Sequence, residues 1–213
     1  MDLEGLRQAA EAGDAGAARE LGHRLCVLEG ASSLEMPDDV PEAEGWLRRA
    51  LAAEPADPVT ATLLAGLLLR QFRTVLEFSP LYDGTGDRQA WLRSLWGRRA
   101  EAFELYRQAL DADPAHAAAA NGMALLVLDE STTDDFVCYT GEDEPEDLDA
   151  QDPAWRAEAA RRLRALLALR PRDTMAAAHL AAVLGEPSPS HLGGLHPARR
   201  RCRPEPPKIV RAC

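Results

Sequence analysis

The chain has 213 residues, with 35 acidic groups, 24 basic groups and a formal net charge of −11. This length suits one large domain or two small ones, and the 46% of hydrophobic residues excludes a disordered polyelectrolyte. Lys208 is the only lysine and Ile209 the only isoleucine, while alanine, leucine and arginine dominate, a bias typical of GC-rich bacterial genomes. Because β-branched residues are scarce, the composition favours helices over sheets.

The first four residues have neither the basic run nor the apolar core of a secretory signal. No stretch reaches the roughly 18 apolar residues of a membrane-spanning helix. We therefore expect a soluble, cytoplasmic protein without a membrane partner. The four cysteines form no CxxC pair, and we expect them to be reduced thiols.

Three segments of the chain superpose without gaps, beginning at Glu42, Glu101 and Glu158. In each segment a small residue is followed four positions later by a larger one, and three positions after that by a third apolar residue. This spacing places the three residues on one face of a helix. Each segment then reaches a proline, which has no N–H and ends the helix. The apolar residues are Ala43, Leu47, Ala50, then Ala102, Tyr106, Ala109, then Ala159, Leu163, Leu166, and the prolines are Pro55, Pro114 and Pro171.

A second apolar helix is predicted after each proline, from Val59, Ala117 and Thr174. Each of these helices has a large residue at one position and an alanine at the next, so that a neighbouring backbone can approach closely. The pairs are Leu64-Ala65, Met123-Ala124 and Leu180-Ala181. Helices of two kinds thus alternate, which is the arrangement of stacked helical hairpins.

This pattern resembles the tetratricopeptide repeat, whose helix A carries a large-small pair and whose helix B carries small and aromatic residues before a proline. The first unit is similar to the related Sel1-like repeat. In it Gly13-Asp14-Ala15 opens a helix, Leu21-Gly22 is the large-small pair, Gly30 closes the helix, and Ala43, Trp46 and Ala50 mark the next one. The resemblance covers about residues 13 to 185. It implies an all-α, right-handed solenoid of three and a half helical hairpins, the last half being residues 173–185. The prolines are 59 and 57 residues apart, against roughly 34 in the family, so long insertions are expected.

The first insertion predicts two lengthened helices joined by a turn between Pro80 and Asp87. Trp91 and Trp96 either hold this hairpin together or form a binding hot spot. The apolar residues that extend the two helices are Leu69, Phe72 and Leu76 on one side and Trp91, Leu92, Leu95 and Trp96 on the other.

The second insertion, residues 129–152, contains eleven acidic residues and no basic one, which predicts a solvated loop. Residues 186–213 are rich in proline and arginine and predict a flexible tail. The chain is therefore expected to consist of a repeat domain, residues 1–185, and this tail.

No Walker loop, HExxH, GxSxG or GxGxxG motif is present, so we expect no catalytic residues, no cofactor and no metal site. Residues 83–87 fit a tight turn better than a calcium loop. The acidic insertion could attract divalent cations or a basic partner. The arginine cluster at residues 199–203 could touch nucleic acid phosphates, although no aromatic residue lies among them to stack on bases. Four possible zinc ligands lack the spacing of common zinc sites: His191, His196, Cys202 and Cys213.

In the tetratricopeptide family, ligands bind the concave surface lined by positions five and nine of each helix A. By register these positions hold Arg19 and His23, Thr62 and Gly66, Asn121 and Leu125, and Ala178 and Ala182. The resemblance implies that Arg19, His23 and Asn121 hold the polar part of an extended peptide, while Leu125 and Leu69 supply apolar contact. The alternative is that these side chains only pack or solvate that helix face.

The expected function is thus that of an adaptor or scaffold without catalysis, which binds a peptide or partner protein on the concave helix-A surface. One alternative is a nucleic-acid-associated accessory protein that uses the basic tail. The other is a metal-binding or enzymatic protein whose site is assembled from distant residues. A homo-oligomer is compatible with each of them.

Overall fold

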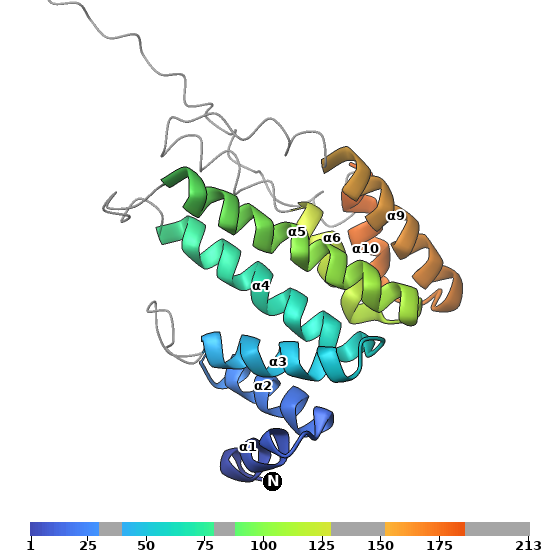
Figure 1. The fold of residues 1–213 in the computed structure, drawn as a ribbon. Coiled ribbons are helices and arrows are strands. Elements are labelled where there is room, and N and C mark those ends of the chain that lie inside the picture. The colour runs from blue at the N-terminus through green and yellow to red at the C-terminus, as the bar shows by residue number, and fades with distance from the viewer. Residues whose placement is uncertain (30–39, 79–87, 129–151, 186–213) are drawn as a thin grey trace, which may run out of the picture.

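The computed structural model describes residues 1–29, 40–78, 88–128 and 152–185, and over these residues the protein is all-helical, with eight helices and no strand (Figure 1). The helices are α1 (Leu3–Glu11), α2 (Ala15–Glu29), α3 (Val40–Ala53), α4 (Pro58–Phe78), α5 (Arg88–Ala112), α6 (Ala117–Leu128), α9 (Asp152–Leu169) and α10 (Thr174–Val183). No helix in these residues combines the length and the apolar character needed to cross a bilayer.

The predicted prolines end the helices as expected. Helices α3, α5 and α9 each stop two residues before Pro55, Pro114 or Pro171. The same turn follows each time, because a backbone N–H two residues after the proline donates to a carbonyl one residue before it, over 3.0–3.1 Å. Proline suits the second position of such a turn because its φ angle is already set.

Three of the helices that follow a turn or loop begin at an aspartate, whose carboxylate accepts a backbone N–H of the first turn. Asp14 caps α2, Asp57 caps α4 and Asp173 caps α10. Such a cap satisfies one of the N–H groups that have no partner within the helix. The start of each of these helices is therefore determined locally.

The predicted apolar stripe forms the core. All nine of its residues, three from each repeat segment, are buried. The large-small pairs after the prolines are buried as well in the first two repeats, while Leu180 and Ala181 in the third are partly accessible. The periodicity thus identified correctly which side of these helices faces inward.

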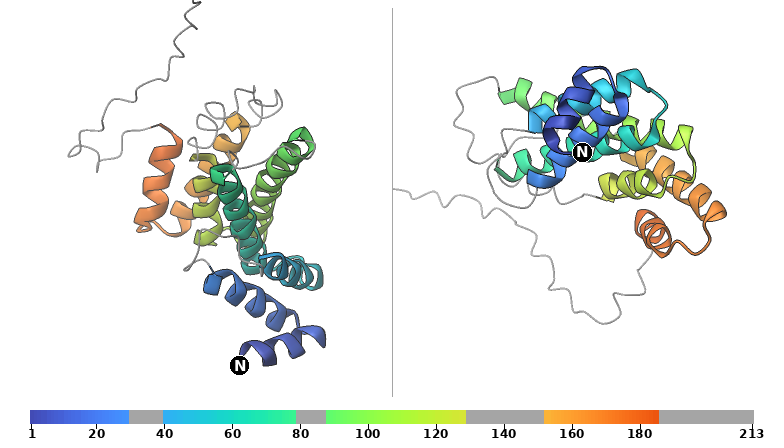
Figure 2. Two further views of the ribbon diagram at one scale, coloured as in Figure 1. Left: turned by 90° about the vertical axis from the view of Figure 1, so that its left-hand side faces the viewer. Right: turned by 90° about the horizontal axis from the view of Figure 1, so that it is seen from below.

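The helices form two rows. We call α2, α4, α6 and α10 the A row, because each packs against the next, and α1, α3, α5 and α9 the B row. Each A-row helix also packs against the B-row helices adjacent to it in the chain. The views in Figures 1 and 2 show the helices following one another from α1 at one end of the molecule to α9 and α10 at the other.

Ion pairs between residues far apart in the sequence connect successive helices of the B row. Arg7 of α1 binds Glu42 of α3 over 2.8 Å, and Arg48 of α3 binds Glu101 of α5 over 2.6 Å. Glu42 and Glu101 occupy the same position of the repeat, so the first two repeat segments place an acceptor for the preceding helix at the same point.

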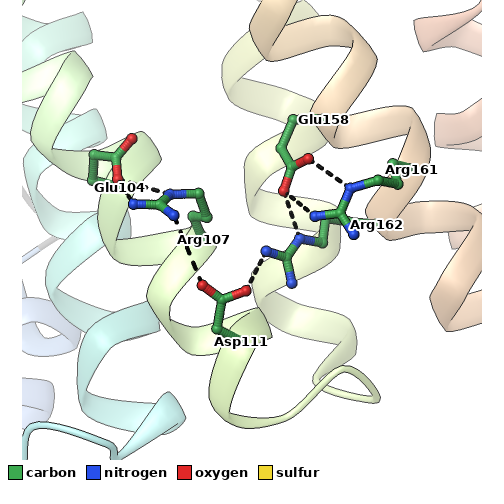
Figure 3. A network of polar contacts seen from close by, with 6 residues as sticks. All are labelled: Glu104, Arg107, Asp111, Glu158, Arg161 and Arg162. Carbon is green, nitrogen blue, oxygen red and sulfur yellow. Dashed lines mark hydrogen bonds and ion pairs between the residues drawn. The ribbon is translucent and has the colours of Figure 1, made fainter.

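Helices α5 and α9 are joined by a larger polar network (Figure 3). Arg162 of α9 lies between Glu158 of its own helix, 2.7 Å away, and Asp111 of α5. Hydrogen bonds from Arg161 and then Arg162 lower the pKa of Glu158 to about 2, against the opposing effect of partial burial. Arg107 extends the network along α5 through Glu104 and Asp111.

Two expectations about the helices need correction. Helix α1 was not predicted, so the described residues contain one helix more than the expected set. Helix α9 begins at Asp152, six residues before the predicted repeat segment, because Trp155 stacks on Phe103 of α5 at a ring-centroid distance of 4.4 Å.

The lengthened helices α4 and α5 are confirmed by the structure. Trp96 is buried, with its ring centroid 5.0 Å from that of Phe72, so it holds the two helices together. The structural interpretation of Trp96 is therefore correct. The side chain of Trp91, the turn at residues 80–87, residues 129–151 and residues 186–213 lie outside the described part.

Candidate binding surface

The residues expected at positions five and nine of the A-row helices are all at least partly accessible to solvent. They occupy matching positions on α2, α4, α6 and α10, which pack side by side in that order. The structure therefore brings them to one side of the A row. We call this side the A-row face and define it by Arg19, His23, Thr62, Gly66, Asn121, Leu125, Ala178 and Ala182 together with Val59, Ala118 and Met175.

Most of the A-row face is uncharged. Residues 58–69 of α4 and the whole of α6 and α10 contain no aspartate, glutamate, lysine or arginine. Helices that are apolar all round are normally buried. Here Leu125 of α6 nevertheless exposes 51% of its surface, Met175 of α10 exposes 60% and Val59 of α4 exposes 41%.

Val59 and Met175 were missed as candidates by sequence reasoning. They hold the same position of their helices, three residues before position five, and the exposed Ala118 is their equivalent in α6. The absence of charged residues all around residues 58–69 of α4 and around α6 and α10 could have identified them. The B-row helices α3, α5 and α9, by contrast, all carry many charged residues. Exposed apolar surface of this kind marks interaction sites.

Arg19 already has a partner within the protein. Its Nη1 lies 2.9 Å from Oδ2 of Asp57, the residue that caps α4, and so joins α2 to α4. Burial alone would raise the pKa of the Asp57 carboxyl, but hydrogen bonds from Thr60 and Arg19 outweigh burial and lower it. A ligand carboxylate would therefore have to compete with Asp57 for this guanidinium.

Asn121 is partnered in a similar way. Its Oδ1 lies 2.8 Å from Nδ1 of His179, so this contact joins α6 to α10. Partial burial lowers the pKa of His179, with Asp173 opposing the effect. The polar contacts of Arg19 and Asn121 thus each bridge two successive helices of the A row.

The other predicted residues differ in accessibility. His23 is exposed, whereas the hydroxyl of Thr62 donates to the carbonyl of Pro58 over 2.7 Å and so satisfies its own helix. The expectation that Leu69 supplies apolar contact to a partner is wrong, because Leu69 is buried in the core. Beside it the end of α2 is held against α4 by a 3.0 Å hydrogen bond from Arg70 to the carbonyl of Cys26.

The residues of the alternative chemistries are not among those that the structure describes. The possible calcium turn, the acidic insertion up to residue 151, the possible zinc ligands and the basic tail fall outside the described residues. Within residues 1–29, 40–78, 88–128 and 152–185, no group of three or more histidine, cysteine, aspartate or glutamate residues could hold a metal ion. No model of a known protein family matches the chain, and no curated protein matches it either.

Proposed function

We propose that the protein is a binding scaffold built as a solenoid of helical hairpins related to tetratricopeptide and Sel1-like repeats. Its A-row face binds the apolar side chains of a peptide or of a segment of a partner protein. Binding, and not catalysis, is the activity that this surface supports.

The observation that carries the proposal is the uncharged, accessible surface of α4, α6 and α10. Helix α6, which carries Leu125, lies between α4 and α10, which carry Val59 and Met175. Large exposed apolar side chains on adjacent helices are costly to leave in water, at roughly 25 cal/mol for each Å² of apolar surface. A partner that covers them recovers this free energy.

The polar residues have a smaller part in this proposal than the family resemblance implies. Arg19 already binds Asp57, and Asn121 already binds His179. A ligand that binds either residue replaces an existing hydrogen bond, so it gains only the difference in free energy between the old bond and the new one. Leu125, by contrast, gives up only water. We therefore assign the affinity mainly to apolar contact and the orientation of the bound segment to the polar residues.

The test is a selection of peptides from a random library on the immobilised full chain, followed by affinity measurements on the selected peptides by fluorescence polarisation. We expect peptides with several apolar side chains. Leu125→Glu should weaken their binding at least about tenfold, because a carboxylate would be placed in the centre of the covered surface.

Leu169→Glu is the matched control. Leu169 is exposed to 59% at the end of α9, in the B row, so the same substitution changes an accessible leucine away from the A-row face. Its binding should equal that of the wild-type chain. Peptides that bind the Leu125→Glu variant as tightly as the wild type would refute the assignment of the A-row face.

A further inference from the structure

Each A-row helix has a second apolar side, distinct from the A-row face. In α4 and α6 four positions of this side, spaced i, i+3, i+4 and i+7, are buried. This spacing forms one stripe along a helix. The residues are Ala61, Leu64, Ala65 and Leu68 in α4, and Ala120, Met123, Ala124 and Val127 in α6.

The corresponding stripe of α10 has no such cover. We call it the end seam and define it by Ala177, Leu180, Ala181 and Leu184. Ala177 is exposed, Leu184 is exposed to 44%, and the other two residues are half-buried. The end seam keeps the small and large apolar residues of an interior repeat although the described residues contain no further repeat.

The opposite end of the molecule is different. Helix α1 exposes Glu4, Gln8 and Glu11 to solvent, as does its N-cap Asp2. The first described helix thus has a polar outer side, whereas the end seam has the apolar residues of an interface.

We propose that a second copy of this chain covers the end seam, through an antiparallel pair of α10 helices related by a twofold axis. The axis passes midway between Leu180 and Ala181. Ala177 of each copy then lies opposite Leu184 of the other copy. A twofold contact of this kind uses the same surface on both copies.

The chemistry of α10 suits this self-pairing. A small residue opposite a large one is how the protein packs its own helices, since Gly22 of α2 lies directly against the side chain of Leu47 of α3. Helix α10 also contains no aspartate, glutamate, lysine or arginine, so two copies bring none of these charges together.

The chain's own C-terminal segment is a poorer occupant. Residues 186–213 contain six prolines with no more than seven residues between consecutive ones. Such a sequence does not predict a helix as long as α10, which has 10 residues. The segment also has an excess of basic residues, which an uncharged seam does not attract.

The test is the molar mass of the full chain in solution, measured by light scattering during size-exclusion chromatography at micromolar concentrations. We expect twice the mass of one chain. Ala177→Glu should raise the dissociation constant of the dimer at least about tenfold, because it buries two carboxylates without partners. Circular dichroism shows whether the variant keeps its helix content.

Ala178→Glu is the matched control, since Ala178 is the next residue, is also exposed, and lies about 100° further around the helix on the A-row face. It should leave the dimer intact. If the wild-type chain is monomeric, the end seam is covered by residues 186–213 or by a helix of another protein, and the proposal is overturned. A dimer that survives Ala177→Glu, or one that both variants dissociate, would overturn it too.

Discussion

The contact between Tyr106 and Gly122 gives the sharpest test of the packing between α5 and α6. A Cβ atom placed on Gly122 would lie 2.5–2.7 Å from three atoms of the tyrosine side chain, closer than real Cβ contacts allow. Tyr106 is buried, and its hydroxyl lies 3.7 Å from the point that a Cβ atom on Gly66 of α4 would occupy. The tyrosine side chain therefore lies close to Gly122 and leaves ordinary contact distance at Gly66.

Gly122→Ala should destabilise the protein in spite of the better helix propensity of alanine. Overpacking a core of this kind costs about 3 kcal/mol at the upper end of its usual range. Replacing a helical glycine by alanine recovers about 1 kcal/mol. We expect a net loss of about 2 kcal/mol in the free energy of unfolding, measured by urea titration with circular dichroism.

Two further variants test whether the contact with Tyr106 causes the loss of stability in Gly122→Ala. Gly66→Ala has room beside the same tyrosine, so it should stabilise the protein by up to about 1 kcal/mol. In a Tyr106→Leu background, which places at this position the residue found as Leu47 and Leu163, Gly122→Ala should become stabilising because the clashing ring atoms are gone. A Gly122→Ala variant as stable as the wild type would show that the ring does not rest on this glycine.

Two other predictions concern charge. The pKa of Glu158 is lowered to about 2 from its ordinary value of 4.5, so the carboxylate contributes stability above about pH 4.5 that is lost as the pH falls toward 2. Glu158→Gln should make the free energy of unfolding fall less steeply over that interval, and an unchanged slope in urea titrations would contradict the network of Figure 3. Peptides bound on the uncharged A-row face should show affinities that hardly change with added salt, whereas contact between the arginine cluster and nucleic acid would weaken steeply; calorimetric titration at several salt concentrations distinguishes the two.

The features that could be predicted from sequence are those determined within one helix. Pro55, Pro114 and Pro171 mark the ends of α3, α5 and α9, and the spacing of Ala43, Leu47 and their equivalents determines which side of each helix is apolar. Both signals recur in three repeats. The nine-residue helix α1 has neither the proline nor a recurrence, so it is marked by its cap at Asp2 and by the spacing of its apolar residues Leu6 and Ala10.

The partners of the candidate residues could not be predicted, because they depend on which helices become neighbours. Asp57 is 38 residues from Arg19, and His179 is 58 residues from Asn121. The repeat register indicates that such residues share a side of the molecule, but it does not show that they bind one another. Leu69 was misjudged for the same reason, since its burial depends on neighbouring segments and not on the pattern of α4 alone.

Side-chain contacts join successive helices within each of the two rows, and those of the A row bear on the proposed binding. Neighbouring A-row helices pack directly and are joined by short contacts such as that between Asn121 and His179. Neighbouring B-row helices are joined by side-chain contacts as well, such as the ion pair of Arg48 and Glu101 and the stacked rings of Phe103 and Trp155. An extended segment that crosses α4, α6 and α10 can contact all three, because these helices pack side by side in this order, and the proposed binding of a peptide requires this geometry.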